Sequence, residues 1–255
     1  MGKKLIRFIL NKIPRKYLIR LSYIFVQFSG LLLRGNNVEC PVCGGKFRKF
    51  LPYGYSYVRE NALCPKCLSL ERHRLLWLFL QNKTGFFRDN LKVLHIAPEQ
   101  SFLKRFKSLA NLEYYTADIE SPIVDYKCDI QNLPFEDEMF DVIICNHVLE
   151  HVNDDKKALS EIFRVLRKNG FAILLVPVDF KRADTFEDSS ITDPKERTEI
   201  FGQYDHVRVY GNDYPDRVQD AGFKIQDENY IDSLSEKIKK RFKLPSLEFM
   251  YAYYK

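Results

Sequence analysis

The sequence predicts an α/β protein, with a mostly parallel sheet covered by helices on both faces and preceded by a small cysteine-rich module. Three observations support this. The apolar runs at 142–145 and 171–176 are short and rich in β-branched residues, which is typical of strands buried on both faces. The segment between them has its apolar residues on one helical face. Two Cys-x-x-Cys pairs precede the sheet, at 40–43 and 64–67.

Length and charge limit the possible functions. The 255 residues are enough for one large α/β domain and an accessory module. Residues 1–35 hold eight bases and no acid, which leaves 32 bases and 34 acids in the rest of the chain. Enzymes acting on nucleic acids usually spread positive charge over the working domain, so this distribution argues against a nucleic-acid partner. With no clear secretory signal, we expect a cytoplasmic protein.

The basic segment 1–35 contains a largely apolar stretch, residues 21–33. Its roughly 13 residues are too short to span a bilayer, which needs about 20. One interpretation is a peripheral amphipathic helix on the inner face of the membrane, attracted by anionic lipids. The other is a helix packed on the protein's own surface. Both stay open.

The cysteine pairs define a predicted zinc-binding module, residues 36–68. Two Cys-x-x-Cys pairs separated by 20 residues are typical of a tetrahedral four-thiolate zinc site, with Cys40, Cys43, Cys64 and Cys67 as ligands. Four thiolates leave no open position, so this zinc would be structural. The alternative is four reduced thiols without metal. We expect Cys128 and Cys145 to be small core residues on strands.

The remaining elements follow from periodicity and from end signals. A helix is predicted to begin at Asn153 or Asp154 and to end at Gly170, and residues 178–210 form an insertion long enough to be a functional lid. Other predicted helices cover 69–81 and 212–222, and the predicted strands cover 92–96, 114–118, 125–128, 140–145, 171–176, 223–230 and 247–254.

Four linked blocks carry a family resemblance. They are Asp129–Phe135 (DIQNLPF), Phe140–Ile143 (FDVI), His147–Val152 (HVLEHV) and Phe163–Gly170 (FRVLRKNG). Together they resemble the class I S-adenosylmethionine-dependent methyltransferases of the type 11 group, over about residues 91–229. The resemblance implies a Rossmann-like methyltransferase sheet within residues 69–255, with the last strand antiparallel, and S-adenosylmethionine as cofactor.

The resemblance also suggests cofactor-binding residues. The family has an acid at the position of His95 and glycines at those of Ala97, Glu99 and Ser101; here Glu99 offers a carboxylate for the cofactor's ammonium group. Asp118 lies 21 residues beyond Ala97, a spacing typical of an acid that binds ribose hydroxyls. The implied cofactor set is His95, Ala97, Glu99, Asp118 for the ribose, Asp129 for the adenine amino group, Ile130 beside its ring, Asn146 and His147.

Histidines are the candidate bases, because they titrate near neutral pH. His147 and His206 are the predicted catalytic residues, and Arg208 and Tyr210 in the insertion are predicted to bind the substrate. His147 has a second interpretation, in which it only orients the cofactor or caps the following helix. The expected methyl acceptor is a small molecule, a glycan or a lipid-linked compound.

Two other function classes remain open. A zinc module before a methyltransferase domain is also found in enzymes that methylate ribosomal RNA. The missing glycines at 97, 99 and 101 would also fit a non-catalytic scaffold that keeps the fold but has lost the methyl donor.

Overall fold

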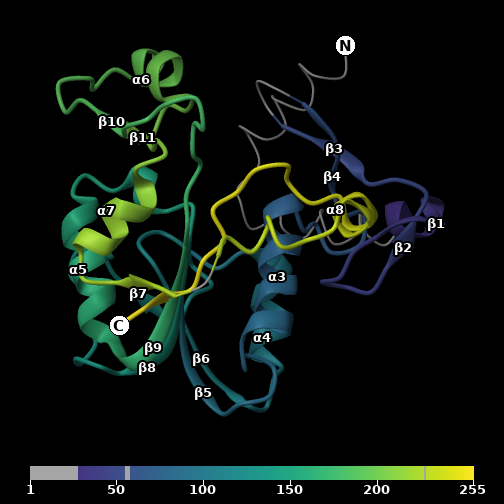
Figure 1. The fold of residues 1–255 in the computed structure, drawn as a ribbon, viewed down its shortest axis with the longest axis horizontal. Helices are drawn as coiled ribbons and strands as arrows, with labels where there is room; N and C mark the ends of the chain where they lie inside the picture. Colours follow the sequence, from purple (N-terminus) through teal and green to yellow (C-terminus); the bar gives the residue numbers. More distant parts are fainter. Residues whose placement is uncertain (1–27, 55–57, 227) are drawn as a thin grey trace. The chain divides into compact units, whose positions relative to one another are not determined.

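The computed structural model describes residues 28–54, 58–226 and 228–255 (Figure 1). The chain forms two compact units: unit 1 comprises residues 1–78 and 235–246, and unit 2 comprises 79–234 and 247–255. The sequence analysis placed 235–246 with the methyltransferase part, whereas here they group with the cysteine-bearing unit. Within the described ranges, no helix has both the length and the apolarity that crossing a bilayer requires.

Unit 2 is built on a seven-stranded sheet in the order β12-β13-β9-β8-β5-β6-β7. Neighbours from β9 to β7 are parallel, whereas β13 is antiparallel to both β9 and β12. The strands are β5 (Leu91–Ile96), β6 (Leu112–Asp118), β7 (Tyr126–Lys127), β8 (Phe140–Asn146), β9 (Leu166–Leu175), β12 (Lys224–Ile225) and β13 (Tyr253–Tyr254). The predicted α/β class and the antiparallel last strand are confirmed.

Helices cover both faces of this sheet. In Figure 1, α5 (Asp155–Val165) and α7 (Tyr214–Asp220) lie on one face, and α4 (Gln100–Lys107) lies on the other. Residues of β5 alternate between these faces. Leu94 joins the main core with α5 residues such as Leu159, whereas His95 contacts the rings of Phe102 and Phe106 in α4. Cys145 of β8 is fully buried in the main core, as predicted.

Helix α5 begins as predicted but ends earlier. The side chain of Asp154 caps it by accepting a hydrogen bond from the backbone N–H of Lys157 at 2.9 Å. The helix stops at Val165, and β9 starts at once with Leu166, which pairs with Phe140 of β8. Gly170 is therefore not a helix end but a strand residue, and a side chain there would meet a backbone oxygen at 2.7 Å. Pairing with β8 outweighs the local helix-ending signals.

The insertion at 178–210 contains elements of its own. It includes β10 (Phe186–Glu187), α6 (Pro194–Phe201) and β11 (Arg208–Val209), and β10 pairs antiparallel with β11. Asp193 caps α6 by accepting from the backbone N–H groups of Lys195 and Glu196. The weak sequence periodicity is explained by elements of only two to eight residues.

Unit 1 contains two small antiparallel strand pairs, helix α8 (Glu236–Phe242) and the first part of helix α3 (Glu71–Lys83), which continues into unit 2. The paired strands are β1 (Arg34–Glu39), β2 (Lys46–Phe47), β3 (Leu51–Tyr53) and β4 (Arg59–Leu63). Arg74 of α3 is fully buried. Its guanidinium donates to the carbonyl oxygens of Ala62, Ser69, Phe242 and Lys243, which binds residues 235–246 into this unit.

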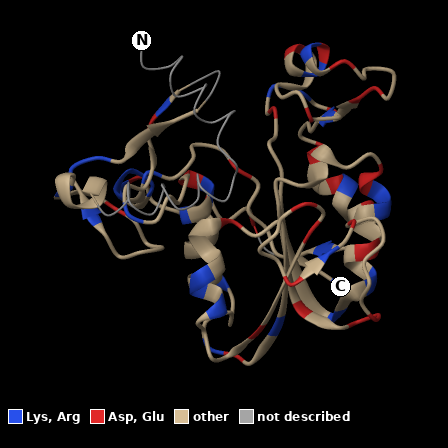
Figure 2. Ribbon diagram, turned by 180° about the vertical axis from the view of Figure 1, so that it is seen from behind, with Lys and Arg blue, Asp and Glu red and all other residues tan. Residues whose placement is uncertain are grey.

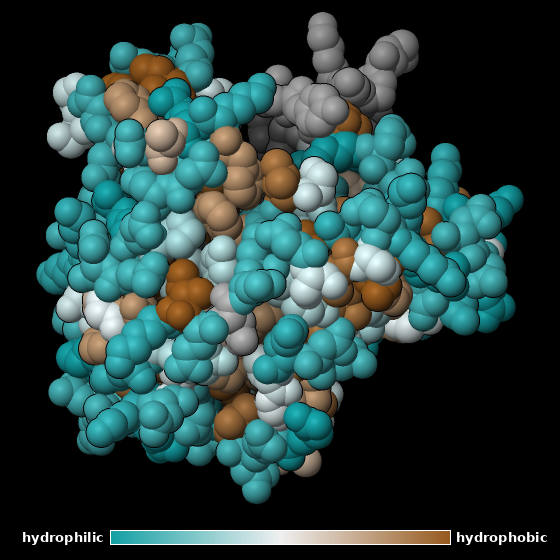
Figure 3. Space-filling view, viewed as in Figure 1, coloured by the Kyte–Doolittle hydropathy of each residue, from teal (hydrophilic) through white to brown (hydrophobic). Residues whose placement is uncertain are grey.

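Apolar side chains on the face shown in Figure 3 occur in small separate groups among hydrophilic ones, as far as the coloured residues show. The main apolar surface lies inside the units. In unit 2 it is shared by β5, β8, β9, α5 and α7. Open α/β sheets usually bind their ligands at the carboxyl ends of the parallel strands, and the candidate site lies at those ends.

Candidate functional site

The turn after β5 adopts a glycine-like backbone conformation without glycine. Ala97 has a φ of +49°, in the left-handed region that glycine occupies most readily. Its N–H donates to the carbonyl oxygen of Ala117 at 2.8 Å, which ties the turn to the neighbouring strand. The predicted cofactor loop thus keeps the turn geometry despite the changed sequence.

Glu99 links this turn to the end of β8. One carboxylate oxygen contacts Nε2 of His95 at 2.8 Å, and the other accepts a hydrogen bond from the side-chain amide of Asn146 at 3.1 Å. Nδ1 of His95 contacts the hydroxyl of Tyr114 at 2.7 Å, and the His95 ring is fully buried. His95 therefore holds the carboxylate of Glu99 in place, and its direct contact with the cofactor stays a prediction.

Asn146 presents an unsatisfied acceptor at the carboxyl edge of the sheet. Its side chain is 4% exposed, and its Oδ1 has no hydrogen-bond partner among the described residues. A buried polar atom left alone costs about 1–3 kcal/mol, so such atoms usually indicate a missing donor. An ammonium group of a bound cofactor is a donor of this kind.

Two predicted carboxylates end the next strands in order. Asp118 ends β6, and its Oδ1 accepts from the N–H groups of Glu120 and Ser121, both at 2.8 Å. Asp129 follows β7, and its Oδ1 accepts from the N–H of Gln131 at 2.9 Å. These bonds orient both carboxylates. Ile130, predicted beside the adenine ring, is instead only 5% exposed and belongs to the main core.

His147 lies immediately beyond β8, with a φ of +54°. Its side chain is 22% exposed, and its Nδ1 lies 3.3 Å from Oε1 of Glu150. Glu150, which the sequence analysis did not single out, is 2% exposed. Burial alone would raise the pKa of Glu150, but the contact with His147 outweighs it and lowers that pKa. His147 and Glu150 thus form a contacting pair at the strand end.

His206 comes from the insertion and meets the segment after β8. Its ring packs edge-on against that of His151, with 4.7 Å between centroids, and it is only 5% exposed. Burial lowers the pKa of His206, which favours the neutral ring. Glu150, His151 and His206 each offer a donor atom within 4.8 Å of the other two. The predicted bases His147 and His206 therefore both lie close to Glu150.

Arg208 and Tyr210, the predicted substrate residues, are directed inward. Both are almost fully buried, at 2% and 0% exposed. The guanidinium of Arg208 donates to the carbonyl oxygens of Leu149, Val152 and Asn153 at 2.6, 2.5 and 2.9 Å. We therefore assign Arg208 to holding the segment that carries Glu150, because three of its hydrogen bonds go to that segment's backbone.

An ionic network surrounds Arg208. Acidic and basic residues both occur on α5 and α7 (Figure 2). Asp155 accepts from the hydroxyl of Tyr210 at 2.7 Å and from both forks of Arg217 at 2.7 and 2.8 Å. Glu187 accepts from Arg208 at 2.9 Å and from Arg217 at 3.0 Å. Burial would raise the pKa of Asp155, but the bonds from Arg217 and Tyr210 lower it. Tyr210 is thus buried with its hydroxyl bonded to Asp155, and its role in substrate binding stays a prediction.

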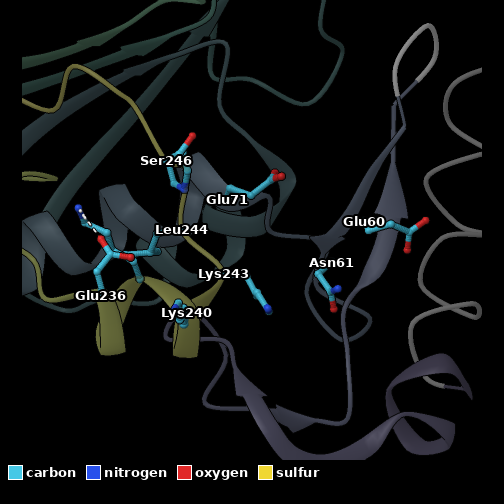
Figure 4. A pocket seen from close by; sticks show the side chains of 10 residues that line it. Glu60, Asn61, Glu71, Glu236, Lys240, Lys243, Leu244 and Ser246 are labelled. Atoms are coloured by element: carbon cyan, nitrogen blue, oxygen red, sulfur yellow. Dashed lines mark ion pairs between the residues drawn. The ribbon is translucent and has the colours of Figure 1, made fainter.

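A hollow of about 280 Å³ opens beside the histidines of unit 2. His206 and Arg208 line it together with Pro177 and Val178, which follow β9, and with Phe201. A second hollow, of about 310 Å³, lies in unit 1 between α8 residues such as Lys240 and the β4 residues Glu60 and Asn61 (Figure 4). The predicted catalytic and cofactor residues do not line the second hollow, so the first is the candidate acceptor site.

The four paired cysteines of unit 1 converge on one point. Sγ of Cys40 lies 3.6 Å from that of Cys67, and Sγ of Cys43 lies 3.7 Å from that of Cys64. Four thiolates about 2.3 Å from one zinc ion would lie about 3.8 Å apart in a tetrahedron. The spacing therefore fits a bound ion and is too wide for disulfide bonds of about 2.05 Å.

Both cysteine pairs have the same backbone turn. The N–H of Gly44 donates to the carbonyl oxygen of Cys40 at 2.8 Å, and that of Leu68 donates to Cys64 at 3.0 Å. Gly44 and Leu68 each follow the second cysteine of a pair and have φ values of +65° and +59°. Two matching turns thus present the four sulfur atoms. Leu68 adopts the left-handed backbone conformation, which costs a non-glycine residue about 1–2 kcal/mol.

One region of the chain matches a known protein family. Residues 82–174 match a family described as a methyltransferase domain. A ubiquinone/menaquinone biosynthesis C-methyltransferase, UbiE, from Campylobacter jejuni is 25% identical over 148 residues, covering 51% of this chain and 57% of that protein. An uncharacterized methyltransferase of Bacillus subtilis, YcgJ, is 40% identical over 45 residues, 18% of each chain. The chain thus spans less than two thirds of these relatives.

Solved structures of similar fold include YcgJ, with 17% identity and a TM-score of 0.45 over 71% of this chain and 94% of that one. Another is the [4+2]-cyclase SpnF, with 18% identity and a TM-score of 0.49 over 81% of this chain and 73% of that one. The family match covers β5 to most of β9, the strands whose ends carry Glu99, Asp118, Asp129 and Asn146. Residues 82–174 therefore match the family described as a methyltransferase domain.

Proposed function

We propose that the chain transfers a methyl group from S-adenosylmethionine, bound along the carboxyl ends of β5, β6, β7 and β8. Asp118 binds the ribose hydroxyls and Asp129 the adenine amino group. Glu99 and the free acceptor of Asn146 bind the cofactor's ammonium group. The observation that carries this proposal is the series of polar groups at successive strand ends within the matched domain.

Methyl transfer requires mainly alignment, because the sulfonium donor brings its own activation. The acceptor atom attacks the methyl carbon in line, the carbon–sulfur bond breaks, and S-adenosylhomocysteine leaves. Oxygen and nitrogen acceptors also lose a proton to a base. His147 is the proposed base, because it follows Asn146 directly and is partly exposed. His206 lies close to Glu150, the carboxylate that His147 contacts.

Calorimetric titration with S-adenosylhomocysteine tests the cofactor site. The wild-type chain should bind one equivalent, and Asp118→Ala should weaken binding by about 1.5–3 kcal/mol, because a charged acceptor of hydrogen bonds is lost. Asp129→Ala should weaken it as well. Asp220→Ala, an exposed acid at the end of α7, is the matched control. No binding by the wild type would favour the scaffold alternative, and equal affinity in all variants would reject the assigned residues.

The four cysteines of unit 1 are proposed to hold one structural zinc ion. Their sulfur spacing and matching turns support this. Elemental analysis should find zinc that is lost in Cys40→Ala and Cys64→Ala and kept in Cys128→Ala and Cys145→Ala. Full zinc content in the first two variants would reject the proposal.

The acceptor is proposed to be a small molecule, a glycan or a lipid-linked compound. Residues 1–27, which hold most of the basic segment, lie outside the described residues. In the described part, Phe28, Leu31 and Leu32 are 65%, 66% and 72% exposed, which supports peripheral contact with a membrane. Vesicles containing anionic lipid should sediment the chain and neutral vesicles should not. Salt-dependent binding to RNA instead would favour the RNA methyltransferase alternative.

A further inference from the structure

The histidine–carboxylate cluster of unit 2 has a composition that neither cofactor binding nor a single base requires. It consists of Glu150 and His151 on the short 3-10 helix η1 (Leu149–His151) and His206 before β11. One donor atom of each residue lies within 4.8 Å of the others. Ligands bound 2.0–2.2 Å from one ion lie at most about 4.4 Å apart, so a sub-ångström adjustment would bring all three to a metal.

The hydrogen bonds around the two rings leave a nitrogen of each available. Nδ1 of His206 lies 3.2 Å from the carbonyl oxygen of Phe201, and Nδ1 of His151 lies 3.3 Å from that of Asp205. A carbonyl only accepts, so both Nδ1 atoms carry a proton, and in the neutral form of each ring Nε2 keeps the lone pair that a metal ion needs. Metal-ligating histidines in proteins are typically oriented by such a bond from the other ring nitrogen.

The donor atoms facing the cluster lack partners. Nε2 of His206 and Oε2 of Glu150 are buried and have no hydrogen bond among the described residues. The residues are 5% and 2% exposed. Neither atom reaches the other, although two such neighbours would normally pair or bind a common group. A cation placed between them would satisfy both at once.

Surrounding contacts hold the three residues in place. Arg208 binds the carbonyl oxygens of Leu149 and Val152, on either side of Glu150 and His151. The N–H of Val207 donates to the carbonyl oxygen of Glu150 at 2.9 Å, which joins η1 to the segment bearing His206. The carboxylate of Asp205 lies 3.4 Å from Nδ1 of His151. The cluster is therefore preorganised by residues outside it.

We propose that Glu150, His151 and His206 bind a divalent transition-metal ion, with Asp205 positioning His151. Two histidines and one carboxylate suit Zn²⁺ or Fe²⁺ and leave coordination positions open. His206 also lines the 280 Å³ hollow beyond β9, so the open positions are accessible from there. A hydroxyl or carboxylate oxygen of a ligand in the hollow, or water, would complete the coordination. This site differs from the closed four-thiolate cluster of unit 1.

Zinc titration of the full chain tests the site without any activity measurement. Protein as purified, carrying its own structural zinc, should bind one further equivalent of Zn²⁺ in a calorimeter. Glu150→Gln and His206→Gln should lower the affinity for this equivalent at least 100-fold. Asp205→Asn should lower it 10- to 100-fold, as loss of an outer-shell partner does. Glu199→Gln, the same charge change at an exposed site on α6, should leave it unchanged.

Nitrogen-detected NMR of the histidine rings on the wild-type chain keeps the test valid if a variant fails to fold. During the titration, Nε2 of His151 and His206 should shift, whereas His73 and His95 should not. Absence of a further equivalent, the same affinity in all four variants, or a response confined to other histidines would overturn the proposal. The last two results would leave His206 and Glu150 as an unmetallated pair.

Discussion

Replacing Arg208 by lysine separates a substrate-binding role from the structural role assigned here. The guanidinium contacts four oxygens from three nitrogens: three backbone carbonyl oxygens and the carboxylate of Glu187. Lysine has a single side-chain nitrogen. It cannot donate both to the carbonyl oxygens that Nη1 of Arg208 contacts and to the Glu187 carboxylate that Nε contacts. The positive charge stays, and the buried Asp155 is not left without a cation.

The magnitude follows from the acceptors that lose their donor. About two of the four should be left unsatisfied, at about 1–3 kcal/mol each, with a discount for the partly exposed Glu187. Arg208→Lys should therefore lower the free energy of unfolding by about 2–4 kcal/mol. Arg182→Lys is the matched control, because Arg182 is 45% exposed, with an ion pair to Asp179 at 3.3 Å and a contact with the ring of Phe186 at 5.6 Å. It should change stability by less than about 0.5 kcal/mol.

Urea unfolding followed by far-ultraviolet circular dichroism provides the measurement. Tryptophan fluorescence would not serve, because Trp77 is the chain's one tryptophan and belongs to unit 1. The midpoint of Arg208→Lys should fall with little change in slope. Equal stability of the Arg208 and Arg182 variants would refute the structural role and restore Arg208 as a candidate substrate residue.

Three further predictions concern other parts of the chain. Asp155→Asn should lower the free energy of unfolding at neutral pH by about 3–5 kcal/mol, because two arginines lose a buried partner. The folded-state pKa of Asp155 is depressed, so its contribution is complete above its unfolded pKa of about 3.9 and is lost as pH falls through the folded value; the variant's stability curve should be flatter in acid. Asn146→Ala should weaken S-adenosylhomocysteine binding, measured by calorimetry, because it removes the free Oδ1 acceptor; it should also lower the free energy of unfolding by about 1 kcal/mol, because the side-chain amide no longer donates to Glu99. His95→Phe should also weaken that binding, through release of Glu99, and wild-type affinity would show that Glu99 needs no support.

The sheet could be predicted because its strands are strong local signals. The strands that end at Ile96 and Asn146 are buried on both faces, as the apolar run at 142–145 predicts for the second of them. The end of α5 could not be predicted, because Gly170 has the sequence signal of a helix end but lies within β9, between Leu166 and Phe171, which both pair with β8. Tertiary pairing decided that boundary.

The candidate site was predictable where a residue acts at its own strand end, and less so where partners are distant. Asp118 was predicted from its spacing beyond Ala97 and Asp129 from the family resemblance, and both lie at the end of a strand or just after it. No signal in the neighbouring sequence shows that Arg208 donates its hydrogen bonds to carbonyl oxygens more than 50 residues away. The proximity of His206 to Glu150 was not predicted for the same reason, although the His-x-x-Glu-His pattern at 147–151 already brings together three potential ligands.

A crystal structure of the chain with S-adenosylhomocysteine would test the central claim most directly. The account predicts the ligand along the carboxyl ends of β5 to β8, with its ribose on Asp118, its adenine amino group near Asp129 and its ammonium group near Glu99 and Asn146. A ligand bound elsewhere, or no ligand at saturating concentration, would contradict the account.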